Sequence, residues 1–200
     1  MAPPNGGSGR PRDPLVEDRV RQAACRLYGD VGWSGFSIDA VAKASQVGKS
    51  SIYLRWPGQT ALLLDAIKKR IDVPYDTDTG SLRGDLLVLS RSIYDLLRSD
   101  VGDVLVRLSA EARAVPELAP GWAEFVAAQV AAMRAIGRRG VARGEITDDC
   151  SMTLMLDALF GGMLMHHMTV GPDSGTDARV ATGGYPDALV DMLLSATSKP

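Results

Sequence analysis

Apolar residues recur every three or four positions along most of the chain, the spacing that places them on one face of an α-helix. The stripe is clear in residues 15–31, and Gly32 is a typical residue to end that helix. Further segments with helical spacing are 37–44, 49–55, 59–71, 82–99, 102–114, 120–143, 151–169 and 185–197. No segment alternates as a strand would, so the pattern predicts an all-α fold.

The two short helices 37–44 and 49–55 are joined by only four residues, Ser45-Gln46-Val47-Gly48. Two short helices joined by a tight turn make a helix-turn-helix. In that motif the second helix enters the major groove of DNA, and its first residues reach the base edges.

The second short helix carries polar groups suited to DNA. Lys49, Ser50 and Ser51 are small or flexible donors for base edges and phosphates. Tyr53 can offer its hydroxyl to a phosphate oxygen, and Arg55 has a forked donor for the DNA backbone. The residue chemistry therefore favours DNA as the partner of this helix.

The segment Gly48-Lys49-Ser50-Ser51 also matches the end of a nucleotide-binding loop, which needs the pattern G-x-x-x-x-G-K-[ST] after a buried strand. Lys43 stands where the first glycine of that loop should be, and the residues before it have helical spacing. A phosphate on DNA is the better interpretation than a phosphate on a nucleotide.

Composition and charge support a protein with a DNA-binding end. The chain has 200 residues, 46% of them hydrophobic, which is enough for a substantial core. Its net charge of −2 is unevenly spread: residues 1–70 hold 11 Lys and Arg against 6 Asp and Glu (+5), and residues 71–200 hold 11 against 18 (−7). A basic N-terminal third indicates that one end meets a polyanion.

The remaining composition indicates a soluble cytoplasmic protein. Cys25 and Cys150 are the only cysteines, so no disulfide framework is expected. Residues 1–13 are rich in Pro and Gly and lack an apolar run, which predicts a disordered arm rather than a signal peptide. Its two arginines could reach a minor groove, although a tail without contacts is the stronger expectation. The most apolar stretch, 152–170, is interrupted by charged and histidine residues and predicts a buried helix rather than a membrane span.

Residues 15–70 resemble the N-terminal domain of TetR-family transcriptional regulators. The resemblance lies in one ordered series: a first helix, then "GWSGFS" and "IDAVA", then a Tyr followed three residues later by an aromatic residue, and last a leucine-rich helix. It implies a three-helix helix-turn-helix domain over residues 14–60, followed by a C-terminal helical ligand-binding and dimerisation domain over residues 61–200.

The resemblance also implies a role for single residues. It places Ser37 at the cap of the second helix and against a phosphate, and Lys49, Ser50 and Ser51 over the bases. Tyr53 and Arg55 would bind the DNA backbone.

This sequence departs from the family pattern at three positions. Gln46 stands where a turn glycine is usual, which predicts left-handed strain in the turn. Gly48 replaces the Ser or Thr that usually caps the recognition helix, a loss of a few tenths of a kcal/mol. Gln59 replaces a Lys that commonly meets a phosphate, so the salt dependence should be shallower by about 0.9.

The last two helices, at about 151–169 and 185–197, are the expected dimer surface. The first is apolar nearly all round and needs cover on every face. The resemblance implies a four-helix bundle made by these helices from two subunits; the alternative is that both belong to the core of one subunit. A ligand pocket is expected between the helices at about 120–143 and 151–169. The side chains expected to line it are Trp122, Phe125, Met155, Leu159, Phe160 and Met163. Apolar residues at this spacing are more often part of the core, which is the alternative.

No catalytic, metal or cofactor site is predicted. His166 and His167 are adjacent, so they point about 100° apart on a helix and do not suit one metal ion. Neither G-x-S-x-G nor H-E-x-x-H occurs. The sequence predicts a homodimeric regulator rather than an enzyme. It would read an inverted-repeat operator on double-stranded DNA. The resemblance implies that it acts as a repressor released by a small apolar or amphipathic effector. The alternative is a ligand-binding sensor or adaptor on the same fold that does not bind an operator.

Overall fold

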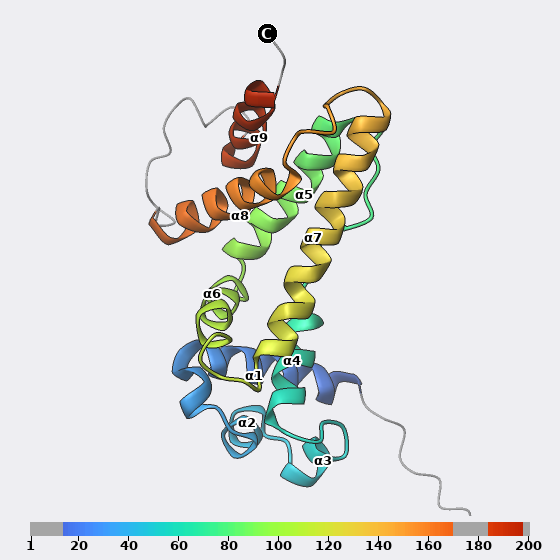
Figure 1. The fold of residues 1–200 in the computed structure, drawn as a ribbon. Helices are drawn as coiled ribbons and strands as arrows, with labels where there is room; N and C mark the ends of the chain where they lie inside the picture. The colour runs from blue at the N-terminus through green and yellow to red at the C-terminus, as the bar shows by residue number, and fades with distance from the viewer. Residues whose placement is uncertain (1–13, 170–183, 198–200) are drawn as a thin grey trace, which may run out of the picture. The chain divides into compact units, whose positions relative to one another are not determined.

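The computed structural model describes residues 14–169 and 184–197, and every regular element in them is an α-helix (Figure 1). The expected arm 1–13 and most of the expected loop between the last two helices lie outside the described residues. The helices are α1 Pro14–Gly35, α2 Ile38–Ser45, α3 Lys49–Tyr53, α4 Gln59–Lys68, α5 Leu82–Arg98, α6 Gly102–Glu111, α7 Ala119–Ala142, α8 Met152–Thr169 and α9 Gly184–Thr197.

The chain forms two compact units, which divide after Ala66. The boundary expected at residue 60 lies a few residues before this division. The first unit extends beyond residue 60 because it includes the start of α4. The carboxylate of Asp65, on α4, accepts hydrogen bonds from Arg21 Nε at 2.8 Å and from Trp56 Nε1 at 2.9 Å. α4 is thus held to α1 and to the segment after α3.

The first unit has a small apolar core that orients α1, α2 and α3. Tyr28 is fully buried on α1 and meets the ring of Phe36 edge to face, with ring centroids 6.1 Å apart. α1 is interrupted at Gly32, whose φ of 68° lies outside the helical region, so the glycine expected to end this helix does break its regular course. The other large buried side chains of the unit are Val20, Ile38, Val41, Val47, Ile52, Trp56, Leu62 and Leu63.

The turn between α2 and α3 has the expected strained residue. Ser37 caps α2, its hydroxyl accepting a hydrogen bond from the Ala40 N–H at 3.2 Å. Gln46, the C-cap residue that follows α2, has the left-handed conformation φ 57°, ψ 35°. Gly48, the N-cap residue of α3, provides no side-chain cap. All three features were predicted from the sequence.

The second unit packs its long helices around α5 (Figure 1). α5 contacts α6, α7, α8 and α9, and α8 also contacts α7 and α9. α8 and α9 approach closely at Gly162, whose carbonyl oxygen accepts a hydrogen bond from the Tyr185 hydroxyl at 3.1 Å. A Cβ added to Gly162 would lie 3.0 Å from Leu189, so glycine allows this approach.

A buried carboxylate joins α5, α7 and the segment before α5. Asp85 has no exposed surface and accepts hydrogen bonds from the Thr79 N–H at 2.6 Å and the Thr79 hydroxyl at 2.8 Å. Arg139, on α7, donates to it from Nε at 3.2 Å and Nη2 at 3.1 Å, and Arg143 donates at 3.4 Å. Burial alone would raise the pKa of Asp85, but these bonds outweigh burial and hold the pKa below its usual value.

Candidate functional sites

The helix α3 turns one side to the core of the first unit and the other side outward. Ile52 is fully buried and Trp56, just after the helix, is 5% exposed. Lys49 and Ser50 are exposed, and Tyr53 is 55% exposed. The side chains expected at the DNA therefore project from a helix that is anchored along its back.

Lys49 forms an ion pair with Asp39 on α2, with 2.6 Å between Nζ and the carboxylate. This pair brings the first turns of α2 and α3 together, and Ser37 precedes α2 by one residue. Both charged side chains are more than half exposed, and ion pairs of this kind contribute little to stability. Little free energy is needed to redirect Lys49 to another anion.

Arg55 has a structural partner that the sequence did not reveal. Its Nε donates to Glu17 on α1 at 2.9 Å, and its Nη1 donates to the Ser51 carbonyl oxygen at 2.9 Å. The hydrogen bond from Arg55 is the largest influence on the pKa of Glu17, which lies below its usual value. Arg55 therefore ties α3 to α1, and its expected contact with the DNA backbone stays a prediction.

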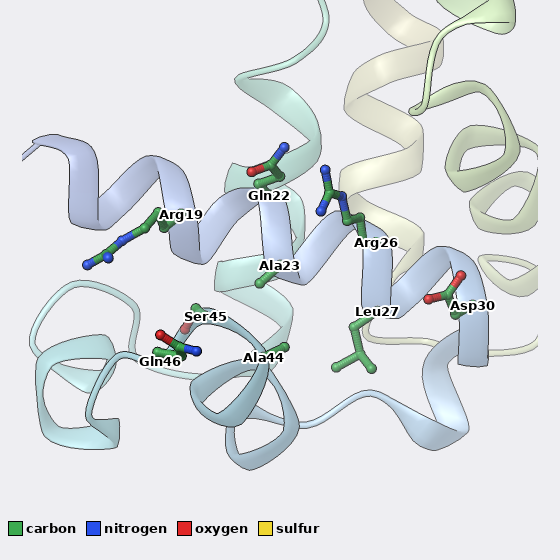
Figure 2. Close-up of a pocket in the computed structure, with 9 residues that line it drawn as sticks. All are labelled: Arg19, Gln22, Ala23, Arg26, Leu27, Asp30, Ala44, Ser45 and Gln46. Atoms are coloured by element: carbon green, nitrogen blue, oxygen red, sulfur yellow. The ribbon is translucent and has the colours of Figure 1, made fainter.

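A hollow of about 400 Å³ lies beside these helices in the first unit (Figure 2). It runs along α1 to the turn at Gln46, and in the figure Leu27 and Ala23 point toward α2 while Gln22 and Arg26 point away from it. None of the described residues that line it carries a buried polar atom without a partner. We assign no ligand to this hollow.

A pocket of about 270 Å³ lies in the second unit. Three of the six side chains expected at a ligand line it: Trp122, Phe125 and Phe160. The other three do not line it and are at most 4% exposed in the core: Met155, Leu159 and Met163. They share helical spacing with Phe160 on α8, and sequence spacing alone does not separate a pocket wall from the core behind it.

The pocket also has polar side chains that helical spacing did not indicate, namely Ser109, Gln129 and Asp157. Gln129 is 6% exposed, and its Nε2 is buried without a hydrogen-bond partner. The hydroxyl of Tyr75 is also buried without a partner. A glutamine on the buried face of α7 is the one signal that could have drawn attention to this wall, because buried polar groups normally have partners.

The two histidines on α8 have separate aromatic and acidic partners. His166 stacks on the Tyr185 ring with centroids 3.9 Å apart, and Nε2 of His167 lies 3.4 Å from Asp103. Burial, and then the nearby charge of Arg98, lower the pKa of His166 and so favour the neutral ring. Among the described residues, no group of three His, Cys, Asp or Glu side chains could hold a metal ion.

Apolar side chains remain exposed on α8 and α9. On α8 they are Leu154, Met165 and Met168, each at least 60% exposed, and on α9 Met192 is 60% exposed. The spacing of the three α8 residues, with the exposed Gly161 between them, puts them on one face. No helix in the described part of the chain is long and apolar enough to cross a membrane.

Both units match models of known protein families. Residues 20–66 match the family model described as "Bacterial regulatory proteins, tetR family", and residues 76–195 match "Tetracyclin repressor-like, C-terminal domain". Together these are the two parts of a helix-turn-helix, DNA-binding transcriptional regulator. The chain belongs to the TetR family.

Relatives and solved structures agree with this assignment. The chain is 27% identical to the HTH-type transcriptional regulator AqdR of Rhodococcus erythropolis, over 96% of this chain and 89% of the relative. It is 30% identical to the HTH-type transcriptional regulator Rv1556 of Mycobacterium tuberculosis strain H37Rv, over 92% and 91%. The crystal structure of the TetR-family regulator SCO0332 is 26% identical, with a TM-score of 0.60 over 92% of this chain and 99% of that one. The fold is also that of FadR from Bacillus subtilis in complex with stearoyl-CoA, at 18% identity and a TM-score of 0.67 over 90% and 96%.

Proposed function

We propose that this regulator is a homodimeric repressor that binds an inverted-repeat operator and leaves it when a small molecule enters the pocket of the second unit. The observation that carries the DNA-binding part is the outward side of α3, where Lys49, Ser50 and Tyr53 are exposed on a helix anchored by Ile52. Exposed polar side chains at the start of a recognition helix are what base edges and phosphates require.

Each residue of this surface has a proposed role. Lys49 exchanges Asp39 for the DNA, and Ser50 and Ser51 contact bases. Tyr53 donates to a phosphate from the exposed side of α3. Ser37 and Arg55 complete the proposed set: the hydroxyl of Ser37 lies at the first turn of α2, and Arg55 both holds α3 against α1 and faces the DNA backbone.

The pocket has a route to α4, which starts in the first unit and ends in the second. Lys68 at the end of α4 pairs with Glu124 on α7, with 2.7 Å between the charged atoms. Glu124 lies between Trp122 and Phe125, which line the pocket, and Val73 after α4 lines it too. A ligand that displaces Val73 would therefore shift the segment that follows α4, whereas the exposed pair of Lys68 with Glu124 adds little to this coupling. The solved structure of FadR with stearoyl-CoA supports a small-molecule effector by analogy.

The first test is binding to the DNA that flanks this protein's own gene, measured as a function of salt and combined with a nuclease footprint. We expect protection of an inverted repeat and a steep salt dependence, because Lys and Arg side chains displace counterions from phosphates. A double variant, Lys49→Ala with Tyr53→Phe, should weaken binding at least about tenfold and reduce the salt slope by about 0.9, the share of one charged contact.

The control is Lys69→Ala, which removes one exposed positive charge outside α3. It should leave operator affinity close to that of the wild type, and size-exclusion chromatography should give the same oligomeric state for all three proteins. Equal binding by the double variant and the wild type would contradict the assignment of α3. Absence of a footprint on every fragment would favour the alternative, a ligand-binding sensor without operator binding.

A further inference from the structure

The wall of the pocket in the second unit is almost entirely apolar, so its few polar groups decide which ligand it accepts. The lining comes from α5, α6, α7 and α8, with Val73 from the segment after α4. Its polar side chains are Ser109, Gln129 and Asp157, and the largely apolar ring of Trp122 adds an indole N–H at a partly exposed position. In apolar pockets a small number of placed polar groups fix the orientation of the ligand and supply specificity.

Two of these three polar side chains cannot donate a hydrogen bond to a ligand. The Ser109 hydroxyl already donates its only hydrogen to the Val106 carbonyl oxygen at 2.7 Å. Asp157 is an exposed carboxylate, which accepts hydrogen bonds and carries negative charge. Among the residues that the structure describes, no Lys, Arg or His lines the pocket, so an anionic ligand would meet this carboxylate without a compensating cation.

Gln129 has an unused donor. Its side chain is 6% exposed, and Nε2 is buried without an acceptor in the part of the chain that the structure describes. An unpartnered buried amide costs free energy, which a ligand atom that accepts its hydrogen would recover.

Tyr75 stands beside this amide. Burial raises the pKa of Tyr75, and the Gln129 side chain, which is close enough to interact with the phenol, lowers it in part. No hydrogen bond of normal geometry joins these two side chains. A half-turn of the amide would let Oε1 accept from the Tyr75 hydroxyl and would direct the NH2 group toward the pocket. Both buried polar groups, the Tyr75 hydroxyl and the Gln129 amide, would then have partners once a ligand is present.

We infer that the effector is a compact, uncharged, apolar molecule with one carbonyl oxygen, which accepts a hydrogen bond from Gln129, and that Tyr75 is the positioning residue for that amide. This inference rests on the proposed role of the pocket as an effector site. The volume of about 270 Å³ has room for on the order of ten non-hydrogen atoms, taking about 30 Å³ as the share of a water molecule. A one-ring ketone is of this size.

The test uses three probes of nearly the same shape: acetophenone, α-methylstyrene and benzoate. α-Methylstyrene replaces the carbonyl oxygen by a CH2 group, and benzoate replaces the methyl group by a charged oxygen. Their affinities for the full chain are measured by protein-observed NMR titration without DNA. We expect acetophenone to bind about tenfold or more tightly than either of the other probes.

Three variants then locate the preference. Gln129→Met keeps the length of the side chain but removes the donor, and it should abolish the preference for acetophenone over α-methylstyrene. Tyr75→Phe should reduce that preference, because the amide loses the group that orients it. Ser109→Ala is the matched control: it removes a pocket hydroxyl whose hydrogen is already used, so the preference should persist.

Equal binding of acetophenone and α-methylstyrene by the wild type, or failure of both to bind, would overturn the inference. A preference that survives Gln129→Met would overturn the role of Gln129, and one untouched by Tyr75→Phe would overturn the role of Tyr75. These outcomes are independent of the proposed repressor function, which is judged by the footprint on DNA. A Gln129-dependent preference in a protein that gives no footprint would support the ligand chemistry while the operator proposal fails.

Discussion

At the scale of single residues, Asp85 is a buried carboxylate that joins α5 to α7 and to the segment before α5. It is fully buried and receives hydrogen bonds from Thr79, Arg139 and Arg143. Asp85→Asn should lower the free energy of unfolding by about 2–4 kcal/mol, because a charged group is lost while two arginines keep their charge. Urea denaturation measures the change. Asp95→Asn, at an exposed position of the same helix, is the control and should cost less than about 0.5 kcal/mol.

The same residue gives a pH dependence with a defined sign. The folded state lowers the pKa of Asp85, so the unfolded chain takes up the proton first as the pH falls. The stability conferred by the carboxylate is complete above its ordinary pKa of about 3.9 and is lost as the pH falls through the lowered folded value. The stability difference between the wild type and Asp85→Asn should therefore shrink below about pH 4, on this linkage argument. A difference that grows there would contradict it.

Residue chemistry could be predicted from the sequence where it is local. The cap at Ser37 and the missing cap at Gly48 depend on neighbours within three positions, and both are found as expected. The pair between Arg55 and Glu17 joins residues 38 positions apart, and no local pattern indicates it. The free donor of Gln129 could not be predicted either, because it exists only where three-dimensional packing withholds a partner.

At the scale of elements, the turn between α2 and α3 stores strain at Gln46. This is the one described residue other than glycine with a positive φ. Gln46→Gly should stabilise the protein by about 0.5–1 kcal/mol, because glycine adopts this conformation without the Cβ penalty, although it adds entropy to the unfolded chain. Thermal unfolding measures the change. Gln22→Gly, at an exposed position inside α1, is the matched control and should destabilise by about as much.

The elements themselves were predicted well and their inner faces less well. Each expected helix is present, with ends that differ by a few residues where the last turn frays. The faces of α8 could not be assigned from the sequence, because this helix is apolar on every side. Its spacing does not indicate which face packs in the core, which lines the pocket and which is exposed. Met155, Leu159 and Met163 enter the core, Phe160 lines the pocket, and Met165 faces outward.

At the scale of the whole molecule, the N-terminal and C-terminal parts of the chain carry opposite net charge. The basic excess lies in residues 1–70, which include the unit with α3, and the acidic excess lies in residues 71–200. α9 is held to α5 by charge pairs, Arg83 with Asp191 at 2.7 Å and Arg91 with Asp187. These pairs occupy charged side chains of α9 within one subunit and leave Met192 exposed.

The exposed apolar face of α8 and α9 gives the last prediction, which concerns assembly. Leu154, Met165 and Met168 on α8 and Met192 on α9 are large apolar side chains in water, and pairing with a second copy would cover them. A double variant, Met165→Glu with Met192→Glu, should shift the protein from dimer to monomer, because two carboxylates would be buried without partners in each half of the interface. Sedimentation velocity measures the oligomeric state, and Val141→Glu, at an exposed apolar position on α7, is the control and should stay dimeric.

Since one helix-turn-helix contacts too little DNA for strong specificity, the monomer should also lose the footprint on the full operator. A double variant that remains dimeric would place the interface elsewhere, whereas a monomer that keeps the full footprint would separate operator binding from assembly.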